Sequence, residues 1–190
     1  MPRPIVAAGV DEAGRGPLAG PVVVAAVILD PSYRVSGLAD SKILSEKKRA
    51  TLMPVIMEKA LAWRVEVISV EQIDAMNILQ ATLLGMRLAV ENLDPLPDIA
   101  LIDGNQAPVL SCKSKTIVKG DQLEPAISAA SILAKEFRDQ IMRKLHLEYP
   151  EYGFSKHKGY PTPHHLEILR KLGPCPHHRR SYAPVREVLK

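Results

Sequence analysis

Four acidic residues, spread over the first two thirds of the chain, have the chemistry to work together at a phosphate: Asp11, Glu12, Asp103 and Asp121. Each falls at the end of a short apolar run or in a turn near glycine. Carboxylate oxygens are hard ligands that select Mg²⁺ or Mn²⁺. Two such ions about 4 Å apart can activate a water and stabilise the leaving oxygen during attack on a phosphodiester. The four acids therefore predict a metal-dependent site for that chemistry.

A glycine turn follows the first two acids and would suit an anion. Gly14 and Gly16 can adopt backbone angles closed to other residues, so that peptide N–H groups approach a ligand, and Arg15 between them adds a positive charge. The apolar runs on either side, 5–8 and 21–29, predict a hairpin of two strands. The alternative is that this is an ordinary turn next to solvated charge.

Strand geometry sets a condition on the two adjacent acids. Neighbouring side chains of a strand point to opposite faces, so Asp11 and Glu12 reach one ion only if the strand twists or bulges. Asp11 is the better candidate ligand.

The other two acids sit where α/β proteins place ligands, beyond the carboxyl ends of strands. Asp103 ends an apolar strand predicted at 98–103, and Asp121 follows a brief strand and a glycine. The alanine-rich helix predicted at 125–148 can lie close to the sheet, which would carry Asp121 towards Asp103. Alternatively, Asp103 is only turn chemistry and Asp121 only favours a helix end.

The remaining pattern predicts the elements that position these residues. We expect a Ser45-capped helix at 46–62 that Pro54 bends or divides, a strand at 63–70, one long helix at 70–92 and a short helix at 162–171. Basic residues crowd the start of the first helix. They indicate a nearby anion or only a solvated face.

Composition bounds the class of protein. The chain has 190 residues, 46% hydrophobic and 24% charged, which suits one α/β domain. Its net charge of +4 fits a polyanionic partner. No apolar run reaches the roughly 20 residues of a membrane span, so we expect no membrane partner and a cytoplasmic location. Cys112 and Cys175 are expected to be free thiols.

The last forty residues are rich in aromatic and basic side chains. In the loop 152–162, Tyr160 is expected to be exposed for stacking and Phe154 to pack inward. The tail from His177 carries more positive charge, which predicts phosphate contact or simple surface charge. We expect a catalytic domain at 1–150 and an extension at 151–190 that packs on it and adds substrate contacts.

Motifs covering almost the whole chain resemble bacterial ribonuclease HII. They are, in order, Gly9-Val-Asp-Glu-Ala-Gly-Arg-Gly-Pro-Leu-Ala-Gly20, Leu38-Ala-Asp-Ser-Lys42, Leu101-Ile-Asp-Gly-Asn105, Val118-Lys-Gly-Asp121, Ile127-Ser-Ala-Ala-Ser-Ile-Leu-Ala-Lys135, Arg138-Asp139, Tyr152-Gly-Phe154, His157-Lys-Gly-Tyr-Pro-Thr162 and His178-Arg-Arg-Ser-Tyr182. The resemblance implies a ribonuclease H-like fold, with a mixed central sheet flanked by helices and a small helical C-terminal extension. It implies endonucleolytic cleavage of RNA in RNA/DNA hybrids and beside single ribonucleotides in duplex DNA, leaving 3′-hydroxyl and 5′-phosphate ends.

The resemblance also assigns roles to residues. The four acids would bind two Mg²⁺ or Mn²⁺ ions, Gly14, Arg15 and Gly16 would sense the 2′-hydroxyl, and Tyr160 would stack on the following sugar. Ser41 and Lys42 would contact substrate as well. Many relatives have a second lysine where this chain has Ile43, which puts one backbone contact in doubt.

Two rival functions make different predictions. A non-catalytic nucleic-acid-binding module would bind without metal and cut nothing, and another metal nuclease of this fold, such as a Holliday-junction resolvase, would ignore the ribose. We expect a monomer that binds RNA/DNA hybrids and ribonucleotide-containing DNA. No motif identifies a replication-clamp partner, so the sequence leaves that association open.

Overall fold

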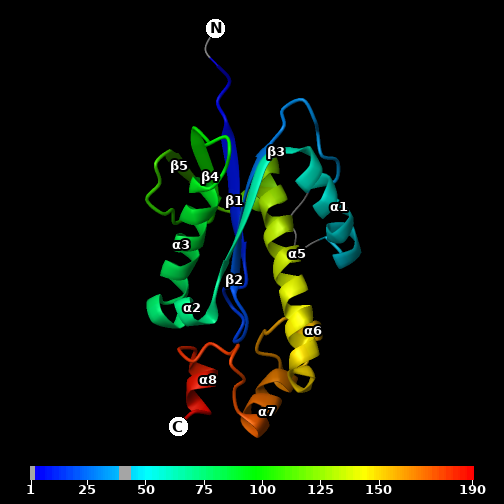
Figure 1. Ribbon diagram of the computed structural model, residues 1–190, viewed down its shortest axis with the longest axis vertical. Helices are drawn as coiled ribbons and strands as arrows, with labels where there is room; N and C mark the ends of the chain where they lie inside the picture. Colours follow the sequence, from blue (N-terminus) through cyan, green and yellow to red (C-terminus); the bar gives the residue numbers. More distant parts are fainter. Residues whose placement is uncertain (1–2, 39–43) are drawn as a thin grey trace.

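The computed structural model describes residues 3–38 and 44–190. A five-stranded mixed sheet, in the order β3-β2-β1-β4-β5, forms its centre (Figure 1). β1 is antiparallel to β2 and parallel to β4, β2 is antiparallel to β3, and β4 is parallel to β5. The strands are β1 Ala7–Ala13, β2 Val22–Leu29, β3 Ala60–Ile68, β4 Ile99–Asp103 and β5 Lys113–Ile117. The predicted hairpin and mixed sheet are confirmed.

Helices cover both faces of this sheet. They are α1 Glu46–Lys59, α2 Val70–Met76, α3 Ile78–Glu91, α4 Gly120–Leu123, α5 Pro125–Glu148, α6 Phe154–His157, α7 Pro163–Leu172 and α8 Ala183–Glu187, with a 3-10 turn at Pro150–Tyr152. Strand alternation separates the two layers. Val24 and Ala26 of β2 pack towards α3, whereas Ala25 and Val27 pack towards α1 and α5. A β-branched run buried on both faces is what this position requires.

Helix α5 is the structural partner of the strand that carries the first acids. Its bounds match the prediction, because Pro125 suits the first turn and the small residues after it permit close packing. A Cβ atom on Gly9 would lie 2.1 Å from the carbonyl carbon of Ala126, so only glycine lets β1 and the start of α5 approach this closely. α5 therefore lies directly against β1.

Two predicted helices were wrong in extent. α1 runs through Pro54 as one helix but ends at Lys59, and β3 begins three residues earlier than expected. The single helix predicted at 70–92 is two helices, because Asn77 has a φ of 71°. Its side chain accepts a hydrogen bond from the backbone N–H of Gln80, so Asn77 ends α2 and caps α3.

The C-terminal segment packs against the β1–β2 turn. α7 and α8 lie together beyond one end of the sheet (Figure 1). The backbone N–H of Leu18 donates to Gly159, and Leu18 in turn accepts from the N–H of Arg179. In the part of the chain that the structure describes, no helix combines the length and apolarity that crossing a membrane requires. Cys112 and Cys175 are free, as predicted.

Candidate active site

Three of the four predicted acids border one cleft of about 220 Å³: Asp11, Glu12 and Asp103. The sheet explains their convergence. β1 and β4 are parallel neighbours whose register pairs Val10 with Ile102, so the next residue on each strand is an acid. The carboxyl ends of adjacent parallel strands thus place Asp11 and Asp103 side by side, as ligand sites in α/β sheets are placed. Glu12 reaches the same cleft although it is the next residue after Asp11.

Asp11 is held in an unfavourable electrostatic environment. Only 5% of the residue is exposed. Burial, followed by the charges of Glu12 and Asp103, raises the pKa of its carboxyl well above the ordinary value. A hydrogen bond of 2.7 Å from the backbone N–H of Glu12 offsets this in part. A cation among these carboxylates would remove the repulsion.

Asp121 lies beside the cleft and does not line it. It is 2% exposed and belongs to the short helix α4. The preceding residue links it to the other acids, since the backbone N–H of Gly120 donates to Oδ1 of Asp103 at 2.7 Å. The main-chain carbonyl of Asp121 accepts from Oγ of Ser128, which ties α4 to α5. Asp103 thus holds the turn that carries the fourth acid.

The donor chemistry of the cleft fits a hard divalent cation, because all the acidic donors are carboxylate oxygens. The acidic side chains are not, however, arranged as the ligands of a metal centre. Within residues 3–38 and 44–190, no three His, Cys, Asp or Glu side chains are grouped so that they could hold a metal ion. The structure therefore brings Asp11, Glu12 and Asp103 to one cleft and places Asp121 in the adjoining turn.

The glycine turn and the predicted aromatic residue face each other at this cleft. Arg15 is exposed, with Nη1 3.6 Å from Oε1 of Glu12. Tyr160 is 47% exposed, and a Cβ atom on Gly16 would lie 3.4 Å from its ring. Phe154 is fully buried. The predictions that Tyr160 is exposed and Phe154 packs inward are confirmed.

Two buried arginines, to which the sequence motifs assigned no role, hold the segment from Gly14 to Pro21. Arg179 donates from Nη2 to the carbonyl of Gly14 at 2.5 Å, from Nη1 to that of Arg15 at 2.9 Å and from Nε to that of Gly20 at 3.0 Å. Arg138 donates to the carbonyls of Pro21, Ala19 and Lys158. Arg179 is fully buried, so the prediction that the basic tail only makes surface or phosphate contacts was wrong for this residue.

Arg138 also explains the first glycine of the turn. Gly14 has a φ of 101°, and a Cβ atom there would lie 2.0 Å from Nε of Arg138. Burial and the neighbouring charge of Arg179 lower the pKa of Arg138 to about 10, which still leaves it charged at neutral pH. In the sequence, Arg138 stands inside an alanine-rich helix and begins the motif Arg138-Asp139, but neither signal predicts that it packs against Gly14.

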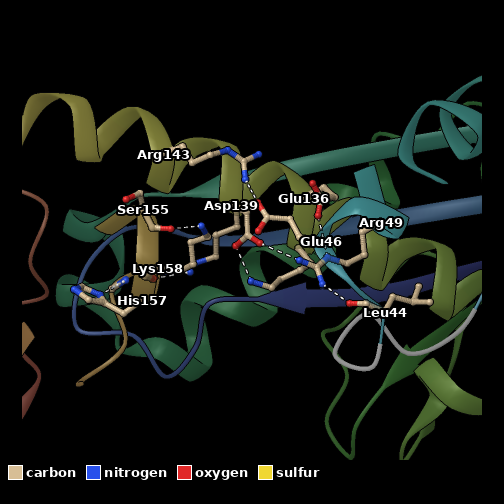
Figure 2. Close-up of polar contacts among 12 residues, drawn as sticks. Leu44, Glu46, Arg49, Glu136, Asp139, Arg143, Ser155, His157 and Lys158 are labelled. Atoms are coloured by element: carbon tan, nitrogen blue, oxygen red, sulfur yellow. Dashed lines mark hydrogen bonds and ion pairs between the residues drawn. The ribbon is translucent and has the colours of Figure 1, made fainter. Parts of the chain in front are cut away.

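Helix α5 contributes Ser131 and Lys135 to the cleft, and an ion-pair network fixes this part of the helix (Figure 2). Nζ of Lys135 lies 2.6 Å from Oδ1 of Asp139. Arg49 of α1 pairs with Glu136 at 2.9 Å and with Asp139 at 3.3 Å. The anion expected near the basic start of α1 is thus, for Arg49, a pair of buried carboxylates. Ser41 and Lys42 lie outside the described residues.

Proteins of known structure share this architecture. The structure superimposes on the ribonuclease H2 from Pyrococcus horikoshii OT3 with a TM-score of 0.82, at 28% identity and covering 96% of each chain. It also matches Bst-RNase HIII in complex with Mn²⁺, with a TM-score of 0.74 at 21% identity, over 97% of this chain and 69% of that one. The fold and the cleft thus define a type 2 ribonuclease H, which is a hydrolase and an endonuclease.

Sequence comparison narrows the class to one family. The family model described as Ribonuclease HII matches residues 8–185. A curated Ribonuclease HII from Bordetella pertussis (strain Tohama I) is 58% identical over 185 residues, which is 97% of this chain and 92% of that protein. The chain belongs to the ribonuclease HII family, and the predicted resemblance is confirmed.

Proposed function

We propose that this ribonuclease H cuts the RNA strand of RNA/DNA hybrids and incises 5′ of single ribonucleotides in duplex DNA, leaving 3′-hydroxyl and 5′-phosphate ends. The observation that supports this most directly is the shared cleft. Carboxylates from two strands, the Gly14–Gly16 turn and the exposed ring of Tyr160 all border it. The groups that we propose for phosphodiester hydrolysis and those that we propose for contact with a ribose therefore line the same cleft.

The acids are proposed to hold Mg²⁺ or Mn²⁺, with two ions in the substrate complex. Asp11, Glu12 and Asp103 would supply the oxygens in the cleft, and Asp121 would add another from the adjoining turn. When bound, such ions activate a water and stabilise the leaving oxygen. The raised pKa of Asp11, caused by burial and adjacent acids, supports this because a cation would offset the crowded negative charge.

The turn at 14–16 is proposed to select ribose. The 2′-hydroxyl is the group that RNA has and DNA lacks. Main-chain groups of a glycine turn can reach it with no side chain between. Arg179 holds the carbonyls of Gly14 and Arg15, and Arg138 packs against Gly14. Tyr160, opposite Gly16, would stack on the next sugar.

The segment 151–190 is proposed as an extension that contributes to the site of a catalytic domain at 1–150, because Tyr160 comes from it and Arg179 holds the turn. Ser41 and Lys42 are proposed to add contacts to the substrate backbone. The physiological substrates are proposed to be hybrids and ribonucleotide-containing DNA, met in the cytoplasm by a monomer.

One substrate tests the proposal: a DNA duplex with a single embedded ribonucleotide, offered with Mg²⁺ or Mn²⁺ beside an all-DNA duplex. We expect metal-dependent incision 5′ of the ribonucleotide and none of the control. Asp103→Asn should abolish incision while the circular dichroism spectrum stays that of the folded protein. Equal cutting of both duplexes would favour a nuclease that ignores ribose, and binding without cutting would favour a non-catalytic module.

A further inference from the structure

A chain of hydrogen bonds through two histidines leads from the C-terminal segment to Tyr160. The backbone N–H of Cys175 donates to Nδ1 of His178 at 3.0 Å. Nε2 of His178 lies 3.0 Å from Nε2 of His165, and Nδ1 of His165 lies 2.9 Å from the carbonyl oxygen of Tyr160. Both rings are buried, with exposures of 1% for His178 and 0% for His165.

The end groups of this chain determine where the protons lie. A backbone N–H only donates, so Nδ1 of His178 is an acceptor and its proton is on Nε2. A carbonyl oxygen only accepts, so Nδ1 of His165 carries the proton and its Nε2 is an acceptor. His178 therefore donates to His165, and His165 donates to Tyr160. One arrangement of two neutral imidazoles satisfies every group.

An added proton would break this arrangement. Protonation of His165 at Nε2 would set two N–H groups against each other across 3.0 Å. Burial lowers the pKa of each histidine to about 4, so both are neutral at physiological pH. Other rings pack around the pair: Phe154 lies edge-on to His165, and His157 stacks on it with ring centroids 4.5 Å apart. Sγ of Cys175 lies 3.2 Å from Nδ1 of His178.

This chain of hydrogen bonds ends at Tyr160, the residue that faces the glycine turn. The carbonyl of Tyr160 accepts from His165 and also from the backbone N–H of Thr162, so its main chain is fixed from two sides. His178 immediately precedes Arg179, which holds the carbonyls of Gly14 and Arg15. Both walls of the ribose-contacting part of the cleft are thus tied to the same short segment.

We propose that His165 and His178 are positioning residues for ribose selection: their hydrogen bond fixes Tyr160 at its place opposite Gly16. This inference rests on the proposed function, in which Tyr160 contacts the sugar. It assigns the two buried histidines a role through Tyr160 and no contact with substrate.

Matched variants separate positioning from packing. His165→Leu removes both hydrogen bonds of the ring, whereas His165→Asn keeps a side-chain N–H near the position of Nδ1. His178→Leu and His178→Gln form a second pair, in which glutamine keeps a donor near the position of Nε2. Each variant is assayed for kcat and KM on the single-ribonucleotide duplex, in the natural background and in Tyr160→Ala.

We expect His165→Leu to lower kcat/KM by about 10- to 100-fold, the scale at which misplaced groups cost activity, with a smaller loss for His165→Asn, which keeps the donor to Tyr160 but lacks the acceptor for His178. In the Tyr160→Ala background, His165→Leu should change kcat/KM by less than about twofold, because coupled residues are not additive. Equal losses in both backgrounds, or losses that follow only the folded fraction, would overturn the inference.

The natural protein itself provides a measurement that does not depend on any variant folding. Long-range ¹H–¹⁵N spectra at pH 7 should show His165 protonated on Nδ1 and His178 on Nε2. Any other pair of tautomers would contradict this chain of hydrogen bonds. Failure of the proposed function would give a different result, because the natural protein would then leave the single-ribonucleotide duplex uncut. If the natural protein cuts this duplex and Tyr160→Ala cuts it less well, additive losses would overturn only the role of the histidines.

Discussion

At the scale of one residue, Asp11 shows that the cleft places a carboxyl group where its negative charge is unfavourable. Its carboxyl is buried against Glu12 and Asp103, and each of these causes raises its pKa. A group whose pKa is higher in the folded state contributes stability below its unfolded pKa and loses it as the pH rises through the folded value. Without metal, at a pH above the ordinary carboxyl pKa, Asp11 therefore destabilises the fold.

Asp11→Asn is accordingly expected to abolish cleavage and to raise the melting temperature in metal-free buffer at pH 7. A gain on the order of 1 kcal/mol corresponds to about 2–4 °C for a chain of this size. The gain should shrink as the pH is lowered through the folded pKa, because Asp11 then becomes neutral as well. Thermal unfolding of the natural and variant proteins across this pH range measures it.

The control for this experiment is Asp30→Asn, and Mn²⁺ gives a second comparison. Hydrogen bonds from Ser32 lower the pKa of Asp30, so its replacement should bring no gain at pH 7. Added Mn²⁺ should raise the melting temperature of the natural protein more than that of Asp11→Asn. A variant no more stable than the natural protein without metal would show that Asp11 is not under this electrostatic cost.

The site could be predicted from the sequence where a residue's role follows from its local pattern. Asp11 and Asp103 each follow a short apolar run in the sequence, and that is enough to expect them at one edge of a sheet. Arg179 could not be found this way. It stands in a run of basic residues that resembles surface charge, and its partners lie 159 to 165 positions away along the chain. Its burial depends on tertiary packing alone.

Among the elements, the pairing of α1 with α5 depends on a buried ion network. Arg49 has 8% of its side chain exposed and contacts two carboxylates of α5, each about as buried. The same two helices are joined near their surface by Arg143 and Glu46, at 2.5 Å. These two links allow a matched comparison of buried and exposed ion pairs in one helix–helix contact (Figure 2).

Arg49→Met should destabilise the protein by about 3 kcal/mol, because it leaves Glu136 and Asp139 buried without this cation. Arg143→Met should cost less than about 1 kcal/mol, since exposed ion pairs contribute little. Urea unfolding followed by circular dichroism measures both values. Equal losses for the two variants would contradict a special role for the buried network.

Element prediction succeeded and failed for identifiable reasons. The bounds of α5 could be predicted because Pro125 marks its start and small residues continue to its packed middle. The break between α2 and α3 could not. The apolar residues Ile73, Met76 and Leu83 keep a helical spacing across it, and only the positive φ of Asn77 divides the two helices. Hydrophobic periodicity predicts which face of a helix is buried, but it does not reveal a single residue whose backbone angle interrupts the helix.

In the whole molecule, the two ends of the chain build one site. The N-terminal hairpin supplies Asp11, Glu12 and the glycine turn, β4 adds Asp103, and the C-terminal segment supplies Tyr160, the histidine pair and Arg179. Arg179 is the main link, because its guanidinium reaches three main-chain carbonyls of the turn and the hydroxyl of Tyr182. Burial lowers its pKa from the usual value. Its planar fork of donors is what a lysine cannot reproduce.

Arg179→Lys should therefore destabilise the protein by about 3 kcal/mol, which corresponds to about 6–12 °C in melting temperature, because charged hydrogen bonds are lost at a buried site. Arg180→Lys is the matched control, since the neighbouring Arg180 is exposed. Below its melting temperature, Arg179→Lys should also discriminate less between the single-ribonucleotide duplex and all-DNA, because the turn at 14–16 is no longer held at its carbonyls. A variant that melts early yet keeps full discrimination would show that Arg179 stabilises the fold without shaping the ribose-contacting turn.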